Sequence, residues 1–165
     1  NFCILRYFNV AGASLSGKIG EIEVSHGHLI KNLAIQYFKP IPKVFIYGKN
    51  YKTKDGTCIR DYIHVSDLAE LHVKILSIIK KKKKSLVINC GYGRGYSVDE
   101  IVNIFKSIKK NTKINYLQRR SGDVAQVYSD TKKMKRIFKY SFKNNNIKRI
   151  LRSAIKWEKN LKRKC

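Results

Sequence analysis

The sequence lacks long hydrophobic runs. Its apolar stretches are as short as LVINC at 86–90, far below the roughly 20 residues that a membrane span requires. The first ten residues, NFCILRYFNV, have neither the basic segment nor the small-residue cleavage site of a secretory signal. We therefore expect no membrane partner and no secretory leader.

The sequence also lacks closely spaced cysteines. Cys3, Cys58, Cys90 and Cys165 are far apart and form no Cys-x-x-Cys pair, so neither a disulfide framework nor a metal site is predicted. Cys3 and Cys90 lie in apolar segments, where a free cysteine behaves as a small hydrophobic residue. Free thiols and the missing signal favour a cytoplasmic location.

Acidic residues are scarce: 11 Asp and Glu stand against 36 Lys and Arg, which gives a net charge of +25. Such an excess is typical of nucleic-acid-binding proteins, and a basic nucleic-acid-binding module is one alternative. However, the lysines are scattered in short runs such as 80–84, and the aromatic residues lie in apolar segments rather than between lysines. We therefore favour a compositional origin and expect no specific nucleic-acid partner.

Apolar segments alternate between two periodicities. Residues 2–8, 44–47, 86–90 and 113–117 are short apolar runs typical of strands, and 2–8 should be buried on both faces of a parallel sheet. Helical spacing predicts helices over 28–38, 66–79, 98–108, 131–138 and 147–161, with a Ser97–Glu100 capping box. Residues 49–62 are expected to be a loop with a hairpin turn at Asp55-Gly56. The alternation predicts an α/β fold.

Two short patterns resemble functional motifs, but their residues do not support the corresponding functions. The segment GYGRGY at 91–96 has Tyr96 where a dinucleotide fingerprint has Gly or Ala, so we expect only a tight turn. Tyr128 and Lys132 have the spacing of a dehydrogenase acid/base pair, but Asp130 between them is a predicted helix cap. His64 and His72 are expected to form local hydrogen bonds.

Four residues have the chemistry of a nucleoside diphosphate site. Arg60 and Arg120 lie between glycine and aspartate residues in polar segments, and arginine is suited to bidentate phosphate contact. Tyr47, at a strand end before a glycine, offers a flat face for a base. Asp123 offers a carboxylate to ribose hydroxyls.

Four segments carry a family resemblance: LRYFNVAGA at 5–13, IYGKNYKTKDGTCIRDYIHVSDLAELHV at 46–73, NCGYGRGYSVDEIV at 89–102 and RRSGDVAQVYSD at 119–130. Together they resemble the UDP-glucose 4-epimerases of the extended short-chain dehydrogenase/reductase superfamily. The resemblance covers essentially the whole chain and matches the C-terminal half of these enzymes. Another NDP-sugar epimerase or dehydratase of the same superfamily is the alternative.

The resemblance implies a fold, and it implies which half of the complete enzyme carries each binding site. Residues 1–165 would comprise the last strands of a Rossmann-type parallel sheet and the small substrate-binding domain. The N-terminal dinucleotide-binding half would precede Asn1, which opens directly into an apolar segment. That half would carry most of the NAD site and the catalytic Tyr-x-x-x-Lys pair. The chain alone is therefore expected to bind a UDP-sugar without turning it over, and a homodimer is expected of the complete enzyme.

The resemblance also assigns roles to the residues on the sugar and cofactor side. Tyr7 would line the nicotinamide, and Asn9 would hydrogen-bond the diphosphate-sugar. Val127 falls where the family varies the size of the sugar pocket, and a valine there should admit an N-acetyl group.

On the nucleotide side, the resemblance supports the roles proposed above for the arginine pair and Asp123. Phe45 would bind uracil through its backbone and Tyr47 through its ring. His28 and Leu29 occupy the position of the family's Asn/His-Leu-x-Pro motif, in which Lys31 stands in place of the proline.

Overall fold

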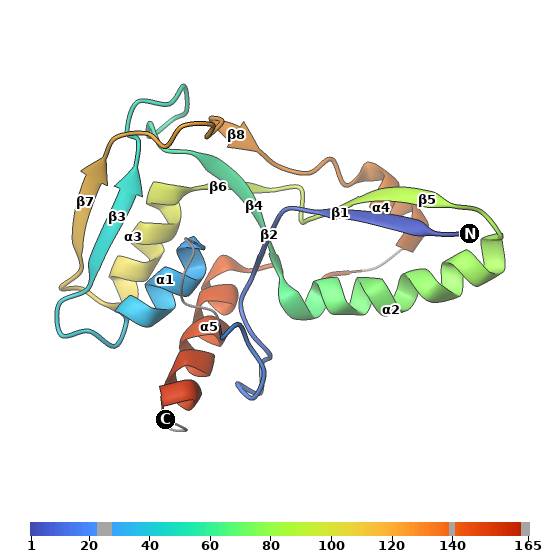
Figure 1. Ribbon diagram of the computed structural model, residues 1–165, viewed down its shortest axis with the longest axis horizontal. Coiled ribbons are helices and arrows are strands. Elements are labelled where there is room, and N and C mark those ends of the chain that lie inside the picture. The colour runs from blue at the N-terminus through green and yellow to red at the C-terminus, as the bar shows by residue number, and fades with distance from the viewer. Residues whose placement is uncertain (23–27, 139–140, 163–165) are drawn as a thin grey trace.

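The computed structural model describes residues 1–22, 28–138 and 141–162. The chain forms an elongated α/β structure, which confirms the predicted fold class (Figure 1). The helices are α1 (Leu29–Gln36), α2 (Val65–Lys82), α3 (Val98–Ile108), α4 (Lys132–Phe138) and α5 (Ile147–Lys162). The strands are β1 (Cys3–Tyr7), β2 (Asn9–Ala11), β3 (Lys43–Tyr47), β4 (Ile59–His64), β5 (Leu86–Cys90), β6 (Gly95–Ser97), β7 (Lys113–Leu117) and β8 (Gln126–Val127).

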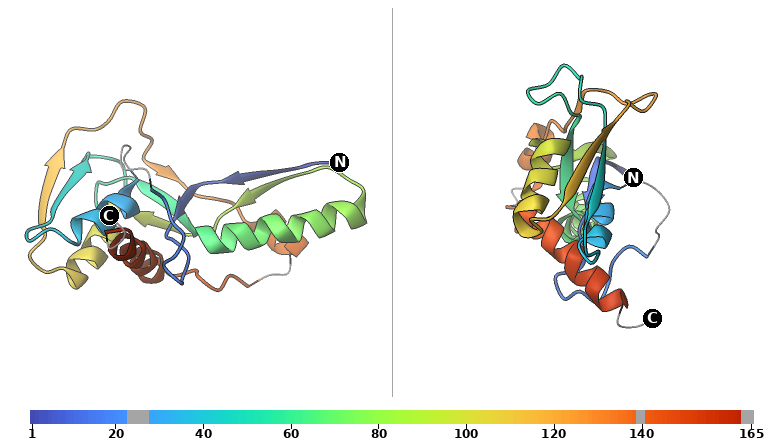
Figure 2. Two further views of the ribbon diagram at one scale, coloured as in Figure 1. Left: turned by 60° about the horizontal axis from the view of Figure 1, so that its bottom comes forward. Right: turned by 90° about the vertical axis from the view of Figure 1, so that its left-hand side faces the viewer.

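The strands are grouped in three small sheets along the long axis. β1 pairs in parallel with β5 at one end, above α2, and β3 pairs in parallel with β7 at the other, beside α3 (Figure 1). Between them, β4 pairs in parallel with β2 and β8 and antiparallel with β6. The two further views show α5 projecting from this central region, close to α1 (Figure 2). β4 therefore lies at the centre of the fold.

The prediction for residues 49–62 was wrong in two respects. Residues 59–62 belong to β4 rather than to a loop. The turn at Asp55-Gly56 exists, with Tyr51 N–H donating to the Gly56 carbonyl at 2.9 Å, but it does not join two paired strands, because β3 pairs with β7 and not with β4. The Asp55 carboxylate accepts hydrogen bonds from the Thr57 N–H and hydroxyl. The segment thus closes on itself before β4 begins.

Two other expectations need correction. β1 is not buried on both faces: Phe2 just before it and Ile4 and Tyr7 within it are exposed, whereas Cys3 and Leu5 are half-buried and pack against the core. The second helix begins at Val65 with His64 as N-cap, rather than at Ser66. The capping box of Ser97 and Glu100 is confirmed. None of the helices in the described part of the chain is long and apolar enough to cross a membrane.

Two fully buried carboxylates connect β4 and α2 to distant segments. Asp61 accepts hydrogen bonds from the backbone N–H groups of Tyr92, Gly93 and Ser129, at 3.1, 3.0 and 3.2 Å, and from the Ser129 hydroxyl. Asp67 accepts from the Tyr92 hydroxyl at 2.6 Å and from the Asn144 amide group at 2.7 Å. Burial and the Asp67 hydrogen bond raise the pKa of Tyr92 above its ordinary range, so this phenol remains a donor.

His64 is held in one tautomer by its neighbours. Its Nδ1 accepts from the Ser66 N–H at 3.1 Å, which requires that the proton be on Nε2. Nε2 lies 3.2 Å from the Ser153 hydroxyl, which also accepts from the Ala13 N–H and donates to the Ile150 carbonyl. The neutral imidazole therefore connects β4, α5 and the loop after β2. Its bond to Ser66 is local, as expected, whereas its contact with Ser153 is not.

We expect Asp61→Asn to destabilise the fold. The asparagine NH₂ group is a donor and would face backbone N–H groups, which are also donors and now bond to the Asp61 carboxylate. Each hydrogen bond to a buried charged group that is lost in this way contributes about 1.5–3 kcal/mol to stability. Urea unfolding should show a loss of roughly 2–4 kcal/mol. Asp130→Asn is the matched control, because exposed Asp130 caps α4 through one N–H and asparagine caps a helix equally well. Equal stability of the two variants would contradict this role of Asp61.

Stability should also depend on His64 below neutral pH. Burial lowers the pKa of His64 below its ordinary value, so the unfolded chain takes up the proton first as pH falls. The free energy of unfolding should therefore be complete above about pH 6.5 and decline at lower pH. His64→Asn, which keeps a capping oxygen for α2, should flatten this decline between about pH 5 and 7. An unchanged pH profile in the variant would show that another group is responsible.

Candidate nucleotide-binding site

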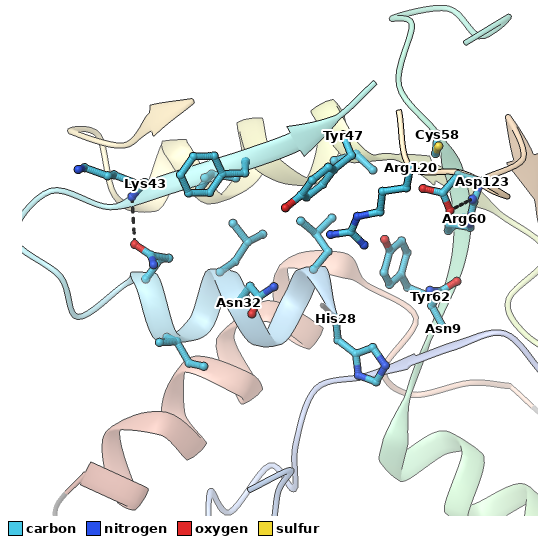
Figure 3. Close-up of a pocket in the computed structure, with 17 residues that line it drawn as sticks. Asn9, His28, Asn32, Lys43, Tyr47, Cys58, Arg60, Tyr62, Arg120 and Asp123 are labelled. Atoms are coloured by element: carbon cyan, nitrogen blue, oxygen red, sulfur yellow. Dashed lines mark hydrogen bonds and ion pairs between the residues drawn. The ribbon is translucent and has the colours of Figure 1, made fainter. Parts of the chain in front are cut away.

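A cavity of about 380 Å³ opens between α1, β3, β4 and the loop after β7. Figure 3 shows side chains from these four segments pointing into one space. Most of the residues expected to contact a nucleotide-sugar line it: Asn9, His28, Leu29, Phe45, Tyr47, Arg60, Arg120 and Asp123. These residues are far apart in the sequence, so their convergence is a property of the fold.

Arg60 is fixed in the cavity wall. Its Nη1 donates to the carbonyls of Ile59 and Val124, at 2.9 and 2.8 Å, and its Nη2 lies 3.6 Å from Asp123 Oδ1. Gly122, with φ of 82°, has the left-handed backbone conformation that glycine adopts readily, and this turn places Asp123 beside Arg60. The charge of Arg60 is therefore held in position before any ligand arrives.

Arg120 is the more available cation. Its guanidinium carbon lies 3.8 Å from the centre of the Tyr47 ring, a cation–π contact, and it has no carboxylate partner among the described residues. Its neighbour Arg119 instead donates to the Asn50 side chain at 2.5 Å and stacks on Tyr51 outside the cavity. The Arg120 guanidinium can therefore leave the Tyr47 ring to bind an anion, whereas the contacts of Arg119 stabilise the fold.

The contacts that hold α1 and its N-terminus involve Lys31, Glu158 and Glu21, which lie outside the cavity. Lys31 is buried and forms a 2.5 Å ion pair with Glu158 of α5, and it also donates to the Glu21 carbonyl. His28 is the N-cap residue of α1, and its Nδ1 lies 3.2 Å from Glu21 Oε1. Lys31 thus fixes α1 against α5 where the family resemblance implies a proline.

Two of the expected site residues lie outside the cavity. Tyr7, at the end of β1, is exposed and has its ring 6.4 Å from that of His72. Val127 lies on β8 directly opposite Arg60 of β4 and is half-buried. The structure does not bring either residue into contact with the space that the others share.

The glycine-rich turn at 91–96 holds a carboxylate of this chain. Two of its N–H groups, those of Tyr92 and Gly93, donate to Asp61, so the turn does not fit a dinucleotide phosphate. Tyr128 is exposed in the loop before α4, and Lys132 is the first residue of that helix. The two therefore span a helix start, as expected, and do not share a helix face.

The sequence analysis missed several residues that line the cavity. They are Asn32, Leu33, Ile35, Gln36, Lys43, Val44, Cys58, Tyr62 and Val98. The spacing of His28, Asn32 and Gln36 on one face of α1 is a signal that could have revealed part of this set.

Comparisons with known proteins identify the family of the chain. Residues 1–91 match the NAD dependent epimerase/dehydratase family. The chain belongs to this family. It is 41% identical to a UDP-glucose 4-epimerase from Azospirillum brasilense, over 96% of this chain and 46% of that protein. It is 42% identical to a putative UDP-arabinose 4-epimerase from Arabidopsis thaliana, over 94% of this chain and 38% of that protein.

A solved epimerase has the same fold. The UDP-glucose 4-epimerase of Stenotrophomonas maltophila, crystallised with NAD and formylated UDP-arabinopyranose, superposes with a TM-score of 0.92. It is 32% identical, and the match covers 99% of this chain and 49% of that one. The chain thus spans about half the length of the epimerases that it matches.

Proposed function

We propose that this chain is the UDP-sugar-binding part of a UDP-glucose 4-epimerase. The observation that carries the proposal is the convergence of two arginines, an aspartate and a tyrosine on one cavity. A nucleoside diphosphate combines a doubly charged group with a planar base. The cavity offers cations at one end and an apolar slot between α1 and β3 at the other (Figure 3).

The positions of the side chains suggest how such a ligand is held. Arg60 and Arg120 bind the diphosphate, since guanidinium groups form strong charge-assisted hydrogen bonds with phosphate oxygens. Asn9 donates to the sugar-linked phosphate, and Asp123 accepts from the ribose hydroxyls. The α1–β3 slot takes the uracil, with the Phe45 backbone and the Tyr47 ring as its partners.

The chemistry of the complete enzyme would need more than this chain. Bound NAD would supply reversible hydride transfer at the sugar C4, and we propose that residues outside this chain would hold most of it, with Tyr7 of this chain lining the nicotinamide. The catalytic tyrosine and lysine would lie outside as well. We therefore propose that the chain alone binds substrate without converting it. A cytoplasmic location and a homodimer of the complete enzyme belong to the same proposal.

Removing Arg120 tests the diphosphate assignment. Arg120→Ala should weaken UDP binding by about 1.5–3 kcal/mol, the contribution of a hydrogen bond to a charged group, as measured by titration calorimetry. Arg94→Ala is the matched control, since Arg94 also stacks on a tyrosine, 4.6 Å from the ring of Tyr96, but lies outside the cavity. Equal affinity in both variants, or no UDP binding by the unchanged chain, would contradict the proposed function.

Val127 tests the sugar pocket. We propose that the valine leaves room for an acetamido group beside Arg60, so the chain binds UDP-GlcNAc as well as UDP-glucose. Val127→Tyr should fill that room and weaken UDP-GlcNAc binding roughly 5- to 100-fold, the usual effect of overpacking, while UDP binding stays constant. Val127→Ala is the control and should change neither affinity. A parallel loss for UDP and UDP-GlcNAc would show that Val127 merely packs in the core.

A further inference from the structure

One wall of the cavity contains a thiol to which the proposed function assigns no role. Cys58 directly precedes β4, lines the cavity together with Arg60 and Arg120, and is only 6% exposed. Figure 3 shows its sulfur beside Asp123 and Arg60, at the cationic end of the cavity. Neighbouring cations stabilise a thiolate, which is the nucleophilic form of cysteine. A small oxidant that enters the cavity can therefore meet this sulfur in its reactive form.

A buried hydroxyl group without a partner lies beside this thiol. The Tyr51 side chain is 6% exposed, and its hydroxyl forms no hydrogen bond with any residue in the described part of the chain. Burial and the thiol of Cys58 next to it raise the pKa of Tyr51 above its ordinary value, so the hydroxyl keeps its proton and remains a donor. Unsatisfied buried polar groups are rare, and a redox or catalytic role is one of the reasons for which they persist.

The Tyr51 ring is held so firmly that its hydroxyl cannot turn to another acceptor. The Arg119 guanidinium carbon lies 4.1 Å from the centre of the ring. A Cβ atom on Gly48 would overlap the ring, so the Gly48 backbone packs directly against it. The Tyr51 N–H also donates to the Gly56 carbonyl at 2.9 Å. An acceptor for this hydroxyl must therefore come to it, and the sulfur of Cys58 is the neighbouring atom that can acquire one.

We propose that Cys58 is a site of oxidation by small hydroperoxides, and that the Tyr51 hydroxyl stabilises the resulting sulfenic acid. The Cys58 thiolate attacks one oxygen of hydrogen peroxide, so that an S–O bond forms and the O–O bond breaks. The sulfur is oxidised, the peroxide is reduced, and the departing hydroxide takes up the proton released by the thiol to give water. The new oxygen on the sulfur is the acceptor that the Tyr51 hydroxyl lacks.

The other described cysteines are not suited to this reaction. Cys90 is fully buried, and burial raises its pKa to about 11. Burial also raises the pKa of Cys3 above its ordinary value. Both lie in the paired strands β1 and β5, at the end of the fold away from β3 and the cavity (Figure 1). Neither is placed to form a disulfide with oxidised Cys58, so the product should remain a sulfenic acid.

Oxidation should also affect ligand binding, and this part of the inference rests on the proposed function. A diphosphate between Arg60 and Arg120 would cover the Cys58 sulfur, so bound UDP should slow its oxidation. Conversely, an oxygen on the sulfur would add a polar group that competes with the diphosphate for the same cations. The oxidised chain should therefore bind UDP more weakly than the reduced chain.

Peroxide treatment in the presence of dimedone, which reacts with sulfenic acids, tests the site by peptide mass mapping. The adduct should form at Cys58 and not at Cys90, and Cys58→Ser should abolish it. Tyr51→Phe should lower the ratio of adduct to sulfinic acid roughly 2- to 10-fold, because a hydrogen bond that slows further oxidation is lost. Tyr51→Phe should fold at least as well as the unchanged chain, since it removes a hydroxyl without a partner. Tyr128→Phe, at an exposed tyrosine outside the cavity, is the matched control and should leave the ratio unchanged.

The outcomes separate this inference from the proposed function. Absence of the adduct at Cys58 in the unchanged chain would overturn the oxidation site, and equal ratios in Tyr51→Phe and Tyr128→Phe would overturn the role of Tyr51. If Cys58 is oxidised in a chain that binds no UDP, the site is confirmed and the proposed function fails. If UDP binds but does not slow formation of the adduct, the coupling between oxidation and ligand binding is wrong.

Discussion

The buried carboxylate of Asp61 is the interaction on which the rest of the structure depends. It lies in β4, the strand that β2, β6 and β8 all join, and it collects N–H groups from the turn after β5 and from the segment before α4. Because neighbouring side chains in a strand point to opposite faces, a fixed Asp61 also fixes the direction of Arg60. The same strand therefore organises the core on one face and the cation of the cavity on the other.

The positively charged side chains differ in whether they have a partner within the described part of the fold. Lys31, Arg60 and Arg119 each contact a polar or acidic partner within the protein. Arg120 has no carboxylate partner among the described residues, so its charge is available to bind an anionic ligand. A second basic surface lies on α5, around Lys148, Arg149, Arg152 and Lys156, without an aromatic ring among its lining residues. Both surfaces would attract a diphosphate over long range, but only the cavity combines cations with a slot for a base.

The sequence predicted much of the fold and of the site, and the failures have physical causes. Periodicity and capping identified α3 and α5, because each buries an apolar face of its own. β4 was missed because Asp61 and His64 are polar residues in inward positions, and their partners lie up to 89 residues away in the chain. The residue types Arg60, Arg120 and Tyr47 pointed to a nucleotide. However, the stacking of Arg120 on Tyr47 depends on the pairing of β3 with β7, which local patterns do not contain.

The central claim is that the cavity between α1, β3 and β4 binds a uridine diphosphate group. The most direct measurement is a backbone amide chemical-shift titration of the labelled chain with UDP. The account predicts that shifts concentrate at residues 28–36, 43–47, 59–62 and 119–124, and that they saturate together with one dissociation constant. Shifts confined to the basic face of α5, or shifts that grow without saturation and disappear with added salt, would contradict it.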